Sequence, residues 1–240
     1  MFKTRRTELE RIDTGDYTPE EYATFLHEIR FINRYLGDSR ALRKSLFKDI
    51  ESKRLLEFSL LDVACGSGEL LRETAKFARR TGKVARLTGI DLHALSFSAN
   101  KALPPNISYV RGDAFRLPFP DDAFDYAISS LFFHHLRDEQ IPLVLSEMAR
   151  VTRRGVFIID LHRHPAAYYL YKMFCLAFKI SPLVKQDGAL SVLKGFRPGE
   201  LREFANESAA RVTRVAPFRI VMRCSGVRDL RLDEHLEKRQ

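Results

Sequence analysis

The chain has 240 residues, 45% of them hydrophobic and 30% charged, which fits one globular α/β domain with additional elements. Its net charge is +9, but the basic residues are scattered, so a solvated positive surface is favoured over a specific nucleic-acid site. Three widely spaced cysteines and an N-terminus without an apolar run exclude a disulfide framework, a zinc knuckle and a signal peptide, and they predict a cytoplasmic protein without a metal centre.

Residues 1–55 are predicted to be helical. Apolar side chains recur at helical spacing after Pro19, and the run Gly37-Asp38-Ser39 separates them from a second helix that carries Leu42, Leu46 and Ile50. These helices are expected to form a cap on the domain that follows.

The most informative segment is 60–70. A short apolar strand reaches Asp62, a turn contains Gly66 and Gly68, and an amphipathic helix follows directly, so backbone N–H groups can approach a ligand closely. A dinucleotide-binding loop would need a third glycine where Leu71 stands. The acid four residues before Gly66 instead suits a ligand whose nearest group is a cationic amine.

Further strands follow, and two of them also end in acids. The run 87–91 ends in Asp91, and the run 107–114 contains Asp113. Strands are then predicted over 124–131 and 156–161, and two closing strands near 212–215 and 219–224. The alternation of strands and helices over 56–161 predicts a parallel sheet with right-handed crossovers, and the closing pair an antiparallel edge.

Each acid has a structural alternative, because Asp62 and Asp91 could cap helices and Asp113 could cap a turn. Three acids that end successive parallel strands nevertheless favour a ligand site, since the carboxyl ends of parallel strands share one edge of the sheet.

The succession of motifs D-x-A-C-G-x-G, G-D-A-x-x-L-P-F-x-D-x-x-F-D and His-His-Leu resembles the class I S-adenosylmethionine-dependent methyltransferases. It is most similar to the small-molecule group that includes ubiquinone- and menaquinone-biosynthesis enzymes, and the resemblance covers roughly residues 56–160. It implies a Rossmann-like, doubly wound, seven-stranded, mostly parallel α/β sheet with an N-terminal helical cap. It also implies S-adenosylmethionine as cofactor and S-adenosylhomocysteine as product.

The resemblance also implies roles for individual residues at the strand ends. Asp62 would face the amino group of the methionine moiety, Asp91 would bind the ribose hydroxyls, Leu92 would cover the adenine, and Asp113 would accept from the adenine amino group. Ala64 replaces the first glycine of the signature, a change expected to be mild because it adds one methyl group and forbids only strained backbone angles. The implied cofactor-binding set is Asp62, Ala64, Cys65, Gly66, Gly68, Asp91, Leu92, Asp113, Ala114, Ser129 and Ser130.

His134 and His135 are the candidate catalytic residues. A histidine suits proton transfer from a hydroxyl group because its unperturbed pKa is about 6.5. The alternative is that His135 packs under the loop while His134 only lines the cavity.

The segment 165–196 is an apolar, aromatic insert after the fifth strand. Its most apolar part, 165–180, is too short for a membrane span of about 20 residues, and Lys172 and Lys179 interrupt it. It is expected to wall the site of a hydrophobic acceptor, with an ordinary core helix or a dimer face as alternatives. The N-terminal helices are expected to close over the cofactor from the opposite side. The positive charge around it is compatible with brief contact with a membrane surface.

The predicted organisation is a cap over 1–55, a methyltransferase domain over 56–226 and a charged tail over 227–240. The favoured function is methyl transfer to a hydroxyl of a hydrophobic or aromatic small molecule, by a monomer or homodimer. A basic pI favours an RNA or protein methyltransferase instead, but the fourth strand ends Ser129-Ser130-Leu131-Phe132 rather than N/D-P-P-Y/F. A non-catalytic cofactor-binding protein is the third alternative.

Overall fold

The computed structural model describes residues 1–35, 37–92, 104–205 and 210–225; the side chains of Arg30, Arg34 and Tyr35 are not described. The predicted tail, 227–240, lies outside these residues. None of the helices within the described ranges has the length and apolar character needed to cross a membrane.

Seven strands form one sheet in the order β3-β2-β1-β4-β5-β7-β6. Strands β1 to β5 are mutually parallel, while β7 runs antiparallel to both β5 and β6, which confirms the predicted Rossmann-like fold with an antiparallel edge. The order reverses between β1 and β4, where ligands of such sheets bind. The strands are β1 Glu57–Val63, β2 Val84–Asp91, β3 Ile107–Arg111, β4 Phe124–Ser130, β5 Thr152–Leu161, β6 Ala210–Val215 and β7 Arg219–Cys224.

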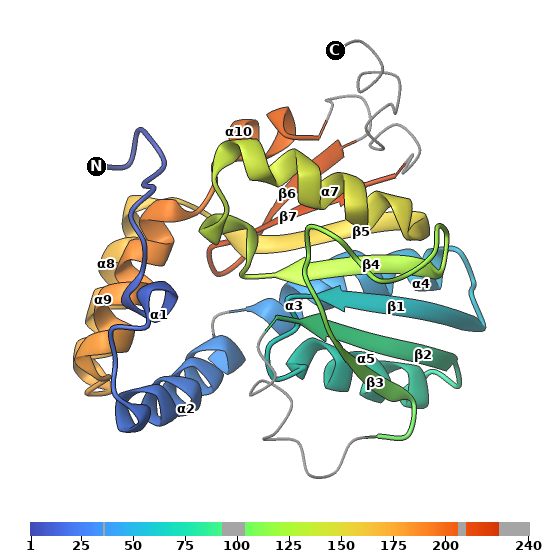
Figure 1. Cartoon of the computed structure of the whole chain (residues 1–240), viewed down its shortest axis with the longest axis horizontal. Coiled ribbons are helices and arrows are strands. Elements are labelled where there is room, and N and C mark those ends of the chain that lie inside the picture. The colour runs from blue at the N-terminus through green and yellow to red at the C-terminus, as the bar shows by residue number, and fades with distance from the viewer. Residues whose placement is uncertain (36, 93–103, 206–209, 226–240) are drawn as a thin grey trace.

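Helices cover both faces of the sheet (Figure 1). One core lies between the sheet and helices α7 (Ile141–Arg150) and α10 (Pro198–Glu203). The other lies under α5 (Glu69–Arg80) and a continuous helical stretch made of α3 (Asp38–Leu42), the π-helix η1 (Arg43–Phe47) and α4 (Lys48–Ser52). The apolar positions of the second predicted helix, Leu42, Leu46 and Ile50, are all fully buried here.

The remaining helices gather at one end of the sheet (Figure 1). They are α1 (Arg11–Thr14), α2 (Pro19–Tyr35), α8 (Pro165–Ala177) and α9 (Pro182–Lys194). Ile32 of α2 packs with Tyr171 and Cys175 of α8 and Val184 of α9 in a separate apolar cluster. The N-terminal helix and the insert were expected on opposite sides of the cofactor. Instead they form one joint cap, because α2 needs the apolar side of α9 to bury its own.

Candidate functional site

A cavity of about 590 Å³ lies between the joint cap and the carboxyl ends of β1 and β4. On the sheet side it is lined by Asp62, Ala64, Cys65, Gly66, Ser130, His134 and His135, so the structure brings these predicted site residues together. Gly68, Asp91, Leu92, Asp113, Ala114 and Ser129 do not line it.

Asp62 and Asp91 end the neighbouring strands β1 and β2. Asp62 is only 2% exposed, and burial together with the charge of Asp91 raises the pKa of its carboxyl to about 8. Asp91 accepts a hydrogen bond from the backbone N–H of Gly66 at 2.8 Å, which ties the loop to the next strand. Two acids so close together favour a cationic ligand, since positive charge stabilises their ionised forms.

The loop between β1 and α5 has a left-handed backbone at Ala64, Gly66 and Gly68, with φ values of 57°, 50° and 72°. The substitution at Ala64 was expected to be mild, but the residue occupies a conformation that glycine adopts far more easily, so that expectation was wrong. Leu131, just after β4, is also left-handed, with φ of 54°. Strained residues thus flank the cavity on both central strands, as is common at functional sites.

The two loop glycines serve different purposes. A Cβ atom at Gly66 would meet no protein atom within 4 Å, so this side of the loop is open for a ligand. A Cβ atom at Gly68 would lie 1.7 Å from the Tyr109 hydroxyl oxygen. The absence of a side chain at Gly68 therefore makes room for Tyr109 of the same chain.

The residues predicted to contact the adenine follow the strands β2 and β3: Leu92 comes after β2, and Asp113 and Ala114 come after β3. Asp113 is exposed and its Oδ1 accepts from the Phe115 backbone N–H at 2.9 Å, which is the turn-capping alternative. Ala114 is half-buried, and Leu92 is 57% exposed. Their roles toward the adenine remain predictions.

Ser129 and Ser130 close β4. Ser129 is fully buried, and its hydroxyl donates to the Val63 carbonyl at 2.8 Å, which holds β4 against β1. The Ser130 hydroxyl oxygen is buried beside the cavity and has no hydrogen-bond partner among the described residues.

The two histidines lie on a short 3₁₀ helix, Phe133–His135, with their ring centroids 4.2 Å apart. His134, not His135, is the buried one, and both line the cavity. The His134 Nδ1 atom lies 2.7 Å from Oδ1 of Asp160, which ends β5 and is fully buried. Burial would raise the pKa of Asp160, but the charge and hydrogen bonds of His134 outweigh it and lower that pKa.

His135 is paired with the N-terminal segment. Its Nδ1 atom lies 3.0 Å from Asp13 Oδ2. Burial disfavours the charged imidazole, but the hydrogen bond to Asp13 and the charges of Glu10 and Asp13 raise its pKa. For Asp13, burial is likewise outweighed by His135 and Lys194, so its pKa falls to about 2.

Sequence reasoning missed four residues of this cluster: Glu10, Asp13, Asp160 and Lys194. Asp160 carried a signal, because it is the last residue but one of the fifth strand, as Asp62 is of β1. Glu10 is 3% exposed and Lys194 2%, and their side chains meet at 3.1 Å. No spacing rule connects residues so distant in the chain.

Among the described residues, Glu10, His134 and His135 form a group whose ligand atoms all lie within 4.8 Å and could surround a metal ion. The Lys194 ammonium already lies 3.1 Å from the same Glu10 oxygen. A divalent ion there would sit beside a buried positive charge, which is costly where water is excluded. The cluster therefore favours proton chemistry over metal binding.

S-adenosylmethionine fits the residues present. It carries a positively charged sulfonium and ammonium, which the buried Asp62 and the half-buried Asp91, whose charges repel each other, would stabilise. The open space beside Gly66 admits a ligand against the loop backbone. When bound, the cofactor supplies an electrophilic methyl group.

Residues 60–155 match a family model described as a methyltransferase domain. Demethylmenaquinone methyltransferase of Staphylococcus aureus is 30% identical over 141 residues, which are 57% of this chain and 56% of the relative. The match thus spans little more than half the length of that curated relative.

Solved structures share the fold. A SAM-dependent methyltransferase from Aquifex aeolicus aligns with a TM-score of 0.53 at 18% identity, over 79% of this chain and 89% of that one. Magnesium protoporphyrin IX methyltransferase from Synechocystis, solved with bound SAH, aligns with a TM-score of 0.52 at 12% identity, over 79% and 84%.

Proposed function

We propose that this chain, because it carries the domain of the class I S-adenosylmethionine-dependent methyltransferases, transfers the cofactor's methyl group to a hydroxyl of a hydrophobic or aromatic small molecule. The curated relatives are named for a small-molecule acceptor, demethylmenaquinone, which supports this class of substrate.

The cavity carries the proposal. Its volume of about 590 Å³ lies within the usual range for small-molecule sites, roughly 300–1,000 Å³. One end reaches Asp62 and the glycine loop, where the cofactor is expected. The cap supplies apolar walls from three helices, through Phe25, Ile29, Ile32, Leu170, Phe174 and Val192. An acceptor held there would be apolar over most of its surface.

The polar groups of the cavity favour a hydroxyl as the reacting group. His134 and His135 lie on its wall, and an imidazole can take the proton that a hydroxyl loses as its oxygen is methylated. The other contribution of the chain is to position the acceptor and exclude water, which accounts for much of the rate in displacement reactions.

The outer side of α8 suits contact with a membrane surface. Tyr169, Met173 and Leu176 are 57%, 65% and 74% exposed, while Tyr171 on the same helix lines the cavity. The exposed Lys172 and Lys179 and the net charge of +9 would attract anionic lipid. We include in the proposal that the chain collects its lipophilic acceptor at such a surface.

An acceptor screen tests the function. Purified protein would be incubated with S-adenosylmethionine and a panel of hydrophobic phenols, enols, amines and thiols, and S-adenosylhomocysteine release would be measured with the mass of each acceptor. We expect methylated products from hydroxylated compounds that carry an apolar body. Turnover confined to amines, or to RNA or protein, would contradict the proposal.

A further inference from the structure

We propose that His134, held by Asp160 and faced by Glu10 from the N-terminal segment, binds and deprotonates an acidic hydroxyl, a phenol or enol, of the acceptor. This inference rests on the proposed function, because it identifies the base and the kind of hydroxyl that it can serve. Asp160 and Glu10 act through His134 and are therefore positioning residues.

Asp160 determines which nitrogen of His134 is free. Its Oδ1 lies 2.7 Å from His134 Nδ1, and its Oδ2 accepts from the His134 backbone N–H at 3.1 Å. An ionised carboxylate can only accept hydrogen bonds, so in the neutral imidazole the proton lies on Nδ1. Nε2 then carries the lone pair that can accept a hydroxyl proton.

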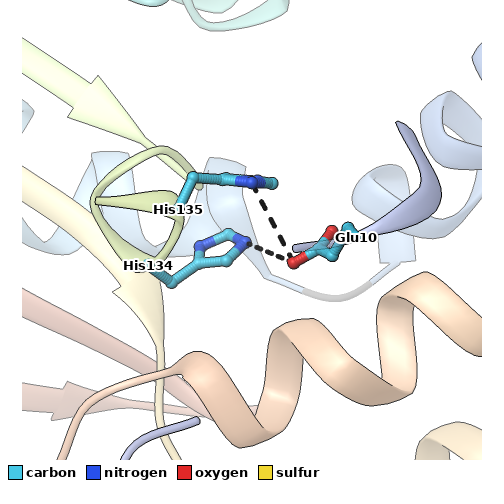
Figure 2. A group of neighbouring side chains, drawn as sticks. All are labelled: Glu10, His134 and His135. Atoms are coloured by element: carbon cyan, nitrogen blue, oxygen red, sulfur yellow. Dashed lines mark ion pairs between the residues drawn. The ribbon is translucent and has the colours of Figure 1, made fainter. Parts of the chain in front are cut away.

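The Nε2 atom of His134 points toward Glu10 (Figure 2). Its distance from Glu10 Oε1 is 3.9 Å, longer than a hydrogen bond, so Glu10 does not engage it directly. An acceptor oxygen about 2.8 Å from Nε2 can approach from the cavity, which both residues line.

Glu10 places negative charge where the imidazolium forms. Its side chain is buried, and neither Glu10 Oε1 nor Lys194 Nζ has a hydrogen-bond partner among the described residues, although the two form an ion pair. This ion pair, at 3.1 Å, holds the Glu10 carboxylate in place beside His134. The His135 ring lies beside that of His134, tilted by 37°, and its contact with Asp13 keeps it turned to that carboxylate.

The N-terminal segment is anchored so that Glu10 stays at this position. The backbone N–H groups of Arg11 and Ile12 donate to the two carboxylate oxygens of Asp187 on α9, both at 3.0 Å. The Arg6 N–H donates to the Leu193 carbonyl at 3.3 Å. Residues 6–12 thereby lie along α9 and bring Glu10 to the histidines.

The proton transfer balances in one step. The hydroxyl O–H bond breaks, its proton passes to His134 Nε2, and the electron pair stays on the oxygen. As that oxygen bonds to the methyl carbon, the bond between the methyl carbon and the sulfonium sulfur breaks, and its electron pair goes to the sulfur. The pKa of a phenol, about 10, is far closer to the pKa of a histidine than is the pKa of an aliphatic alcohol. An acidic hydroxyl is therefore the group that this base can deprotonate.

Equilibrium binding tests the assignment without turnover. Full-length protein saturated with S-adenosylhomocysteine would be titrated calorimetrically with 4-heptylphenol and with 4-heptylanisole, which lacks the hydroxyl hydrogen. We expect the wild type to bind the phenol about tenfold more tightly than the ether. This difference corresponds to the free energy that one hydrogen bond contributes in a closed site. Wild-type protein that holds S-adenosylhomocysteine but neither probe would overturn the proposed acceptor class itself.

Variants separate the base from general packing. Glu10→Gln and Asp160→Asn should lose most of the preference for phenol and keep the affinity for the ether and for S-adenosylhomocysteine. Glu10→Asp, which retains the charge, should keep more of the preference than Glu10→Gln. The exposed Glu8→Gln, two residues away, is the matched control and should behave as wild type.

Two results would overturn the inference while leaving the proposed function intact. One is an unchanged phenol preference in both Glu10→Gln and Asp160→Asn. The other is an equal loss of affinity for phenol and ether, which would mean that the two carboxylates only shape the cavity. Thermal melting of each variant shows whether it is folded, and Glu10→Asp decides the outcome if Glu10→Gln unfolds.

Discussion

Asp62 should make cofactor binding depend on pH. Burial and the charge of Asp91 raise the pKa of the Asp62 carboxyl to about 8, far above the value of about 3.9 for an exposed aspartate. A bound ammonium group favours the ionised form. Binding should therefore release a proton at pH values between about 4 and 8.

The magnitude follows from the fraction ionised. With a pKa of about 8, roughly 1% of the Asp62 carboxyl is ionised at pH 6 and half at pH 8. If the complex requires the ionised form, affinity should rise by about 50-fold between these pH values. Without ligand, rising pH has the opposite effect on folding: it lowers the stability that Asp62 contributes. The folded-state pKa lies above the unfolded one, so the contribution of protonated Asp62 to stability is complete below about pH 4 and is lost as pH rises to about 8.

Calorimetric titration with S-adenosylhomocysteine, which shares the ammonium group, at pH 6, 7 and 8 measures this dependence. Repeating each titration in two buffers of different ionisation enthalpy counts the protons released. The Asn side chain of Asp62→Asn cannot ionise, so any pH dependence left in this variant comes from the ligand itself. The variant is therefore the matched control. Identical pH profiles for the wild type and Asp62→Asn would refute the reasoning.

Three further changes test other parts of the site. Asp91→Ala should weaken S-adenosylhomocysteine binding by about tenfold to a hundredfold, because it removes the proposed ribose acceptor and the hydrogen bond to the Gly66 N–H. Its circular dichroism spectrum should be unchanged, and unchanged affinity would contradict the assignment. Ala64→Gly should raise the free energy of unfolding by up to about 1 kcal/mol in chemical denaturation, because it relieves the strain of a left-handed alanine. A clear loss of stability would argue against that strain. Leu176→Glu should reduce co-sedimentation with vesicles rich in phosphatidylserine. Leu143 is also exposed but lies on α7, away from the cap, so Leu143→Glu should not reduce it. Equal effects of the two substitutions would exclude α8 as the contact surface.

The sheet could be predicted because its signals are local. Each central strand is a short apolar run that ends in a turn, and the acids Asp62 and Asp91 mark where the strands leave the core. Parallel pairing then follows from the intervening helices, and it places the strand ends together.

The cap and the histidine environment could not be derived in the same way. Glu10 meets His134 and Lys194 only because the N-terminal segment follows α9, and no periodicity encodes a contact between such distant segments. The left-handed backbone at Ala64 was missed for a different reason: the sequence does not reveal which positions have strained backbone angles, and Ala64, with φ of 57°, is one of them.

The family match ends at residue 155, before α8 and α9 begin, and it starts after the N-terminal helices. The apolar cavity walls contributed by α2, α8 and α9 thus come from the two stretches outside the shared module, whereas His134 and His135 lie within it. Under the proposed function, substitutions in those stretches would change the acceptor while the strand ends expected to bind the cofactor stay the same. The same modularity gives protein engineers a natural boundary for grafting new caps onto this sheet.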